Sequence, residues 1–187
     1  MPPPPPPTSF TFTAASTPGW STPVGSGTYA WTRRSGGTPS SSTGPTTGVG
    51  GSGYYYFCET SSPRQLGHVR APSGPWPSRP LTEHGPPSPR NPNARQVFTL
   101  FYDGSACTAT GHVISGVTFQ VHMYGATMGS LEVRDAVGNA RWSRNGNQGN
   151  SWQAQSVTGF ASPSLLFRYV RGSSYTGDAA IAQVGVC

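Results

Sequence analysis

Residues 116–134 of the 187-residue chain read GVTFQVHMYGATMGSLEVR, and they hold the clearest structural pattern in the sequence. From position 117 to 124 the side chains fall into two alternating sets, one apolar (Val117, Phe119, Val121, Met123) and one mostly polar (Thr118, Gln120, His122, Tyr124). A period of two is typical of a β-strand that buries one face. Gly125 and Gly129 then bracket a turn where a side chain would crowd the backbone. The stretch predicts a strand, a glycine turn and the start of a second strand.

The sequence on both sides of this stretch is also divided into short apolar segments and turns. We expect strands in residues 53–59, 96–104, 151–160, 164–172 and 177–187, and a hairpin in residues 130–144. Only 10% of the residues are charged, whereas the chain holds 25 glycines and 20 prolines, so runs of helix-forming residues are absent. Many short strands separated by turns predict an all-β fold, a β-sandwich.

Proline marks the borders of the domain. Residues 1–9 read as a stiff Pro-rich linker, and residues 10–187 read as one domain. Residues 64–95 interrupt it with eight prolines and five arginines, so they form either a disordered Pro/Arg-rich insert or a gene-model error. The sequence shows no signal peptide and no apolar run of membrane-spanning length. The oligoproline run favours a piece of a longer extracellular protein over a cytosolic one.

The net charge of +6 raises the question of nucleic-acid binding. All twelve basic residues are arginines, and the 64–95 segment, with Glu83, carries +4, which leaves +2 for the rest of the chain (6 − 4). A nucleic-acid interface needs basic residues clustered on a folded face. The distribution of charge therefore argues against nucleic acid as a partner.

His122 is the residue that most suggests an enzyme. A catalytic base needs an orienting carboxylate and a nearby nucleophile, and the sequence has no nucleophile elbow, phosphate-binding glycine loop, zincin histidine pair or Cys-x-x-Cys motif. Glu132 and Asp135 are three residues apart, so on a strand they face opposite sides. We interpret His122 as a sheet histidine rather than a metal ligand or base. A hydrolase has no support in the sequence, and we predict that the chain is not an enzyme.

Three segments carry a family resemblance. They are residues 116–134, ARWSRNGNQGNSWQAQSVTG at residues 140–159, and LLFRYVRGSSYTGDAAIAQVGVC at residues 165–187. In this order they resemble the second half of a MAM domain, which has a Phe-x-x-His-Met-Tyr-Gly strand, a Trp-Ser-Arg-x-Gly-x-Gln-Gly-x-x-Trp segment, a Gly-Asp-x-Ala strand and a final cysteine. Upstream, PGWSTP, Trp31 and STGPTTGVGGSGYYYF resemble the first half. The resemblance covers residues 10–63 and 96–187.

The resemblance implies a jelly-roll-like sandwich of two antiparallel sheets that serves as an extracellular adhesion or recognition module, without catalytic activity. We assign structural roles to the residues that match the family's motifs, which are Trp20, Phe119, His122, Met123, Tyr124, Gly125, Trp142, Gly146, Gly149, Trp152 and Gly177. Tryptophan is large enough to cover much of a sheet face, and the asparagines and glycines of NGNQGN suit a turn.

The cysteines depart from the family's usual two disulfides. This chain has Cys58, Cys107 and Cys187, and it has Pro-Gly-Trp at residues 18–20 where the family has Cys-Gly-Trp. Since Cys187 matches the closing cysteine, the resemblance implies a Cys107–Cys187 disulfide and no amino-terminal one. The alternative pairings are Cys58–Cys107 and Cys58–Cys187. Cys58 is otherwise a buried thiol or an intermolecular partner, and we favour the buried thiol.

Some family members hold a cation, read as calcium, with acidic side chains. Asp178 matches the aspartate of the Gly-Asp-x-Ala motif, but Ala182 and Gln183 replace acidic residues on the same strand. Calcium takes about six to eight oxygen ligands, several of them from carboxylates. The resemblance therefore implies at most a weak calcium site at Asp178, which is read equally well as a turn or capping carboxylate, and it implies no other cofactor.

Two functions follow. The first is protein–protein adhesion outside the cell or at its surface, with another protein or a like module as the partner. Loops carry recognition on sandwiches, so the candidate residues are Arg33, Arg34, Arg144 and Tyr175. The alternative is a carbohydrate-binding sandwich that stacks aromatic side chains on a glycan. A planar row of exposed aromatic side chains would favour that alternative.

Overall fold

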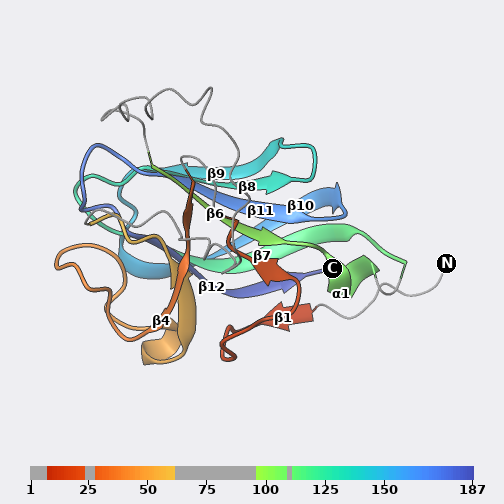
Figure 1. Ribbon diagram of the computed structural model, residues 1–187, viewed down its shortest axis with the longest axis horizontal. Helices are drawn as coiled ribbons and strands as arrows, with labels where there is room; N and C mark the ends of the chain where they lie inside the picture. The colour runs from red at the N-terminus through yellow and green to blue at the C-terminus, as the bar shows by residue number, and fades with distance from the viewer. Residues whose placement is uncertain (1–7, 24–27, 62–95, 109–110) are drawn as a thin grey trace, which may run out of the picture.

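The protein folds as a sandwich of two β-sheets (Figure 1). The computed structural model describes residues 8–23, 28–61, 96–108 and 111–187. The predicted insert at residues 64–95 and the first seven residues of the predicted linker lie outside the described residues. Thr8 and Ser9, the last two residues of that linker, belong to strand β1 (Thr8–Phe10), which pairs with the final strand of the chain.

Six strands form the first sheet, called sheet A. They follow the order β10-β7-β12-β5-β4, and β1 pairs with β12 off this path. Every pairing is antiparallel. The bounds are Thr32–Ser35 for β4, Tyr54–Phe57 for β5, Ile114–Met123 for β7, Gly149–Ser162 for β10 and Ala179–Val186 for β12. The alternating stretch of the sequence is β7, which lies between β10 and β12.

Six further strands form sheet B, in the order β2-β6-β11-β8-β9, with β3 paired to β6. The bounds are Trp20–Ser21 for β2, Thr28–Ala30 for β3, Val97–Tyr102 for β6, Ser130–Asp135 for β8, Ala140–Asn145 for β9 and Leu165–Val170 for β11. The predicted hairpin is β8–β9. Sheet B is antiparallel except that β3 runs parallel to β6, a pairing that the sequence did not predict.

The main core lies between the two sheets. Val117, Phe119, Val121 and Met123 of β7 are all buried in it, which confirms the predicted alternation. The Phe119 ring packs edge-to-face against Trp142 of β9 and Phe167 of β11, with 5.1 Å between centroids in both pairs. Burying a side chain of this size contributes about 1.5–3 kcal/mol. These contacts join β7 of sheet A to sheet B.

Sheet A is also covered on its outer face. Tyr55 and Phe57 of β5 form a second buried apolar cluster with Ala180 and Ala182 of β12. The chain between β4 and β5, which we call the covering loop (residues 36–53), packs on this cluster through Val49 of the 3-10 helix η1 (Val49–Gly51). The adjacent aromatics Tyr54 and Tyr56 pack on the main core instead. A strand with aromatic residues at consecutive positions is thus buried on both faces.

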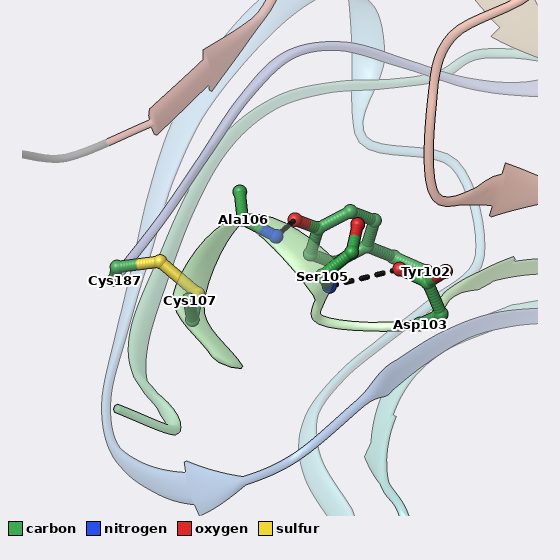
Figure 2. The surroundings of a disulfide bond; sticks show 6 residues. All are labelled: Tyr102, Asp103, Ser105, Ala106, Cys107 and Cys187. Atoms are coloured by element: carbon green, nitrogen blue, oxygen red, sulfur yellow. Dashed lines mark hydrogen bonds between the residues drawn. A yellow bond between two sulfur atoms is a disulfide. The ribbon is translucent and has the colours of Figure 1, made fainter. Parts of the chain in front are cut away.

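One disulfide joins the two sheets near the end of the chain (Figure 2). Helix α1 (Ser105–Thr108) follows β6 of sheet B and carries Cys107, which bonds to Cys187 after β12 of sheet A, with 5.8 Å between their Cα atoms. The Asp103 carboxylate accepts a 2.9 Å hydrogen bond from the Ser105 N–H at the start of this helix. Of the three pairings considered, the structure has Cys107–Cys187, and Cys58 is buried outside the disulfide.

Candidate functional site

The covering loop is fastened to sheet A at one end of the sandwich. The Thr43 hydroxyl donates to the Tyr124 carbonyl at 3.0 Å and accepts from the Asp178 N–H at 2.8 Å. The Gly44 N–H donates to the same Tyr124 carbonyl at 2.9 Å. Thr43 and Asp178 are separated by 135 positions in the sequence. The loop, the end of β7 and the start of β12 therefore meet in one hydrogen-bonded junction.

Asp178 is fully buried in this junction. Its Oδ1 atom accepts a 2.8 Å hydrogen bond from the Thr60 N–H and lies 2.9 Å from the Thr60 hydroxyl. Among the described residues, no three His, Cys, Asp or Glu side chains lie close enough together to hold a metal ion. A calcium site built on several carboxylates does not fit this environment. The Asp178 carboxylate instead caps the chain at Thr60.

His122 lies on the outer face of β7, where only 2% of its surface is exposed. Its Nε2 atom is 3.1 Å from the Oδ1 atom of Asn150, and its ring packs 5.4 Å from that of Trp152. Burial lowers the pKa of His122 below 6.5, and the hydrogen bond to Asn150 offsets part of that shift. The imidazole is therefore neutral near pH 7. Its described side-chain partner is an amide, which does not orient a catalytic base as a carboxylate does.

Gly125 and Gly129, which bracket the predicted turn, lie where the chain passes close to itself, whereas a Cβ atom on Gly146 or Gly149 would meet no atom within 4 Å. A Cβ atom on Gly125 would lie 2.3 Å from the Thr176 carbonyl oxygen, and one on Gly129 would lie 1.8 Å from the Val170 carbonyl oxygen. No side chain fits at either distance. These two glycines let the β7–β8 turn pack against the chain that follows β11.

The motif tryptophans are used in packing. Trp20 stacks on Tyr102 with centroids 5.0 Å apart, and Trp152 packs against Tyr55 at 5.6 Å. The Trp152 indole also donates to the Thr47 carbonyl of the covering loop at 2.9 Å. Trp142 lies on Phe119, as described above. All three are partly buried, so these tryptophans do not form an exposed platform for a sugar.

Two of the four predicted recognition residues are engaged within the fold. The Arg33 guanidinium donates to the carbonyls of Phe12 and Thr13 and lies 3.7 Å above the centre of the Tyr54 ring. Arg34 donates to the carbonyl of Gly37. Both arginines are partly buried and lie in strand β4, so the prediction that they lie in a loop was wrong. They were chosen because loops carry recognition on sandwiches, and a role for them in binding stays a prediction.

The other two candidates are exposed. Tyr175 has 56% of its surface exposed. Arg144 lies on β9, where every residue except Trp142 is exposed. Within the described residues its hydrogen bonds go to the neutral amides of Gln148 at 3.4 Å and Gln155 at 3.3 Å. Arg144 therefore presents a positive charge that these partners do not neutralise.

The hairpin itself was predicted, but the exposed valine at the tip of the β8–β9 hairpin was not among the predicted recognition residues. Val137 is 82% exposed there. The turn is held by Asp135, whose carboxylate accepts from the N–H groups of Val137 at 3.1 Å and Asn139 at 2.8 Å and pairs with Arg141 at 2.9 Å. Burial raises the pKa of Asp135, but the hydrogen bonds from Asn139 and Arg141 outweigh it and lower the pKa overall. The hairpin is thus a rigid support for an exposed valine.

The two packed sheets, the buried motif residues and the exposed hairpin define a β-sandwich module whose accessible features lie on its surface. No protein-family model matches the chain. The chain is 35% identical over 172 residues to MAM domain-containing glycosylphosphatidylinositol anchor protein 1 of Homo sapiens, which covers 83% of this chain and 15% of that protein. It is 43% identical over 74 residues to MAM and fibronectin type III domain-containing protein 1 of Acropora millepora, covering 37% of this chain and 17% of that protein.

The chain belongs to the MAM domain family. It spans about 15% of the length of the anchor proteins that it matches. Among solved structures it is similar to the K2 cleaved adhesin domain of Lys-gingipain, with a TM-score of 0.56 and 11% identity over 97% of this chain and 99% of that domain. That likeness concerns the fold alone. Within the described part of the chain, no helix has the length and apolar character needed to cross a membrane.

Proposed function

We propose that the chain is an extracellular recognition module that mediates adhesion by binding another protein, and that it is not an enzyme. Membership of the MAM family carries this proposal, because one set of relatives is named as glycosylphosphatidylinositol anchor proteins and another relative is named for both MAM and fibronectin type III domains. The disulfide between Cys107 and Cys187 supports an oxidising, extracellular location. The module is one part of a larger cell-surface or secreted protein.

The β8–β9 hairpin is the surface best suited to such a partner. It is an edge of sheet B, since β9 pairs only with β8 among the described strands. Val137 supplies an exposed apolar contact at the tip of the hairpin, and Arg144 supplies a positive charge on its edge strand, β9. A rigid hairpin loses little conformational freedom on binding. The partner surface that fits it is apolar at its centre and acidic beside it.

A bead-aggregation assay tests the proposal with a second copy of the chain as the first partner. Beads coated with the chain should clump, and a Val137→Asp, Arg144→Glu variant should clump several-fold less. Ser115→Asp is the matched control, because Ser115 is exposed at the start of β7, outside the hairpin. A chelator is expected to have no effect, because no three His, Cys, Asp or Glu side chains of the described residues lie close enough together to hold a metal ion; loss of clumping on chelation would restore the weak calcium site at Asp178.

Absence of clumping would contradict binding between like modules, and the chain would then be screened on an array of extracellular domains. Absence of any protein partner on that array would contradict the proposal itself. Equal clumping by the hairpin variant and the wild type would show that the interface lies outside the hairpin.

A further inference from the structure

A polar cavity of about 420 Å³ lies where the covering loop meets sheet A. Six residues of its lining belong to the loop and carry hydroxyl groups: Thr38, Ser40, Ser41, Ser42, Thr43 and Thr46. The hydroxyls of Thr38, Ser40 and Thr43 are already bonded within the fold. Tyr124 at the end of β7 and Asn150 on β10 complete its wall. None of the lining residues is charged. The volume lies within the range of about 300–1,000 Å³ that is usual for small-molecule sites.

The cavity is built before any ligand binds. The Thr38 hydroxyl donates to the Thr43 carbonyl at 2.7 Å, and the Thr38 N–H donates to the Pro45 carbonyl at 3.0 Å. Ser40 is joined to Ser61 through their hydroxyl groups at 2.6 Å. Together with the bonds from Thr43 to the junction, these contacts close the loop on itself and fix it to the sheet. A preorganised wall lowers the entropy cost of binding.

The backbone at Ser42 adds an independent observation. Ser42 is exposed on this wall and has a φ of 62°, in the left-handed region that residues other than glycine rarely adopt. Such conformations cost about 1–3 kcal/mol and tend to occur at binding sites, where they aim a side chain. Glycine would adopt this φ without strain.

His122 orients the side-chain amide of Asn150, which forms part of the cavity wall. The Nδ1 atom of His122 has no hydrogen-bond partner within the described residues. A buried N–H without a partner is less common than a buried acceptor without one, so we assign the proton to Nε2. Nε2–H then donates to the Oδ1 atom of Asn150 at 3.1 Å. The NH2 group of Asn150 is left to donate to a ligand in the cavity.

We infer that this cavity is a binding site for a neutral saccharide. Sugar hydroxyls both donate and accept hydrogen bonds, and they match the hydroxyls of Ser41, Ser42 and Thr46 together with the amide donor of Asn150. The absence of charge in the lining argues against phosphate, sulfate and carboxylate ligands, which need cationic donors. The cavity is open to solvent, and its volume suits one or two sugar rings. Tyr124 supplies the aromatic side chain.

The site is separate from the hairpin and does not depend on protein adhesion. The test uses the full chain on an array of neutral glycans, acidic glycans and peptides. It is followed by ligand-observed NMR titration with lactose, cellobiose, maltose and diacetylchitobiose. At least one neutral saccharide should bind saturably. Asn150→Asp keeps the acceptor for His122 but removes the NH2 donor, and because Asn150 is exposed it should weaken binding about two- to tenfold, as expected for the loss of one ordinary hydrogen bond.

Two further variants separate binding from folding. Ser151→Ala alters the exposed neighbour of Asn150, which does not line the cavity, and should bind as the wild type does. Ser42→Gly should weaken binding while the melting temperature stays the same or rises, because the strain is released. Three results would overturn the inference: no saturable binding of any neutral saccharide, equal affinity of Asn150→Asp and wild type, or array binding confined to acidic glycans or peptides.

Discussion

Removal of the Cys107–Cys187 disulfide should measure how strongly the two sheets are tied together. Figure 2 shows the bond between α1 and the end of the chain, and Figure 1 places the C terminus beside that helix. The two cysteines are 80 positions apart, so the bond closes a long loop in the unfolded chain. We take the double variant Cys107→Ser, Cys187→Ser as the perturbation.

The loop length sets the expected magnitude. The chain-entropy relation gives about 15 cal/mol/K for a loop of about 80 residues, or about 4.5 kcal/mol at 25 °C. Measured disulfides commonly give about 2–4 kcal/mol, because the unfolded state keeps some structure. We therefore expect the double variant to lose about 2–4.5 kcal/mol of its free energy of unfolding. A domain has about 5–15 kcal/mol in total, so this is a large fraction.

Equilibrium unfolding in guanidinium chloride, followed by tryptophan fluorescence, measures this change. The wild type with dithiothreitol should lose the same free energy as the double variant, and the double variant should not respond to the reductant. A loss below about 0.5 kcal/mol, or a wild type that is insensitive to the reductant once its thiols are shown to be free, would refute the loop-entropy reasoning.

Two further predictions concern buried polar groups. Tyr169→Phe should cost about 1–3 kcal/mol in chemical denaturation, because the Tyr169 hydroxyl accepts from the Gly129 N–H at 2.9 Å and donates to the Gly177 carbonyl, and both would be left without it. Tyr175→Phe is the exposed control and should change little; equal losses would contradict the prediction. For His122, the folded pKa lies below the unfolded value of 6.5, so the unfolded chain takes up protons first. The contribution of neutral His122 to the free energy of unfolding should therefore be fully present above about pH 7 and be lost as the pH falls through 6.5 toward the folded pKa. In His122→Gln this part of the pH dependence should vanish. Equal slopes in both proteins would count against it.

The alternation of residues 117–123 predicted β7 and its buried face. One face of that strand packs against sheet B and is apolar, whereas the outer face carries mostly polar side chains. The hairpin was predictable for a similar reason, since a Val-Gly-Asn turn separates two short strands. In both cases the signal is local, and it lies within about ten residues of the structure that it specifies.

The junction was not predictable because its partners are far apart in the sequence. The covering loop is rich in Gly, Ser and Thr and has no apolar period, so nothing in it indicates that Thr43 binds the chain at Asp178. Its effect was nonetheless visible in one place. Tyr54 to Phe57 are four consecutive aromatic residues, and a strand with one solvent face would alternate. The sequence predicted only a strand here; the structure explains the run, because Tyr54 and Tyr56 pack on the main core while Tyr55 and Phe57 lie in the cluster under the covering loop.

The missing amino-terminal cysteine raises the question of what holds the first strands to the sandwich. Trp20 follows Pro18 and Gly19 at this point, and its ring packs against Phe10 at 5.4 Å and Phe12 at 5.2 Å. It also stacks on Tyr102 of sheet B at 5.0 Å. Aromatic pairs of this kind contribute about 0.5–1.5 kcal/mol each beyond the area that they bury.

The amino-terminal segment has further attachments on the side of sheet A. Phe12 packs on Tyr56 at 4.9 Å, and its carbonyl accepts a 2.6 Å hydrogen bond from Arg33. Strand β1 adds backbone pairing to β12. The Trp20–Tyr102 and Phe12–Tyr56 pairs and the charge-assisted hydrogen bond from Arg33 join the segment to the two sheets, and they sum to about 2.5–6 kcal/mol before the entropy of ordering the segment is subtracted. Since a disulfide gives about 2–4 kcal/mol, these contacts are large enough to hold the segment without the covalent bond. The loss of the cysteine therefore does not imply a loose amino terminus, because the aromatic residues and Arg33 hold it from both sheets.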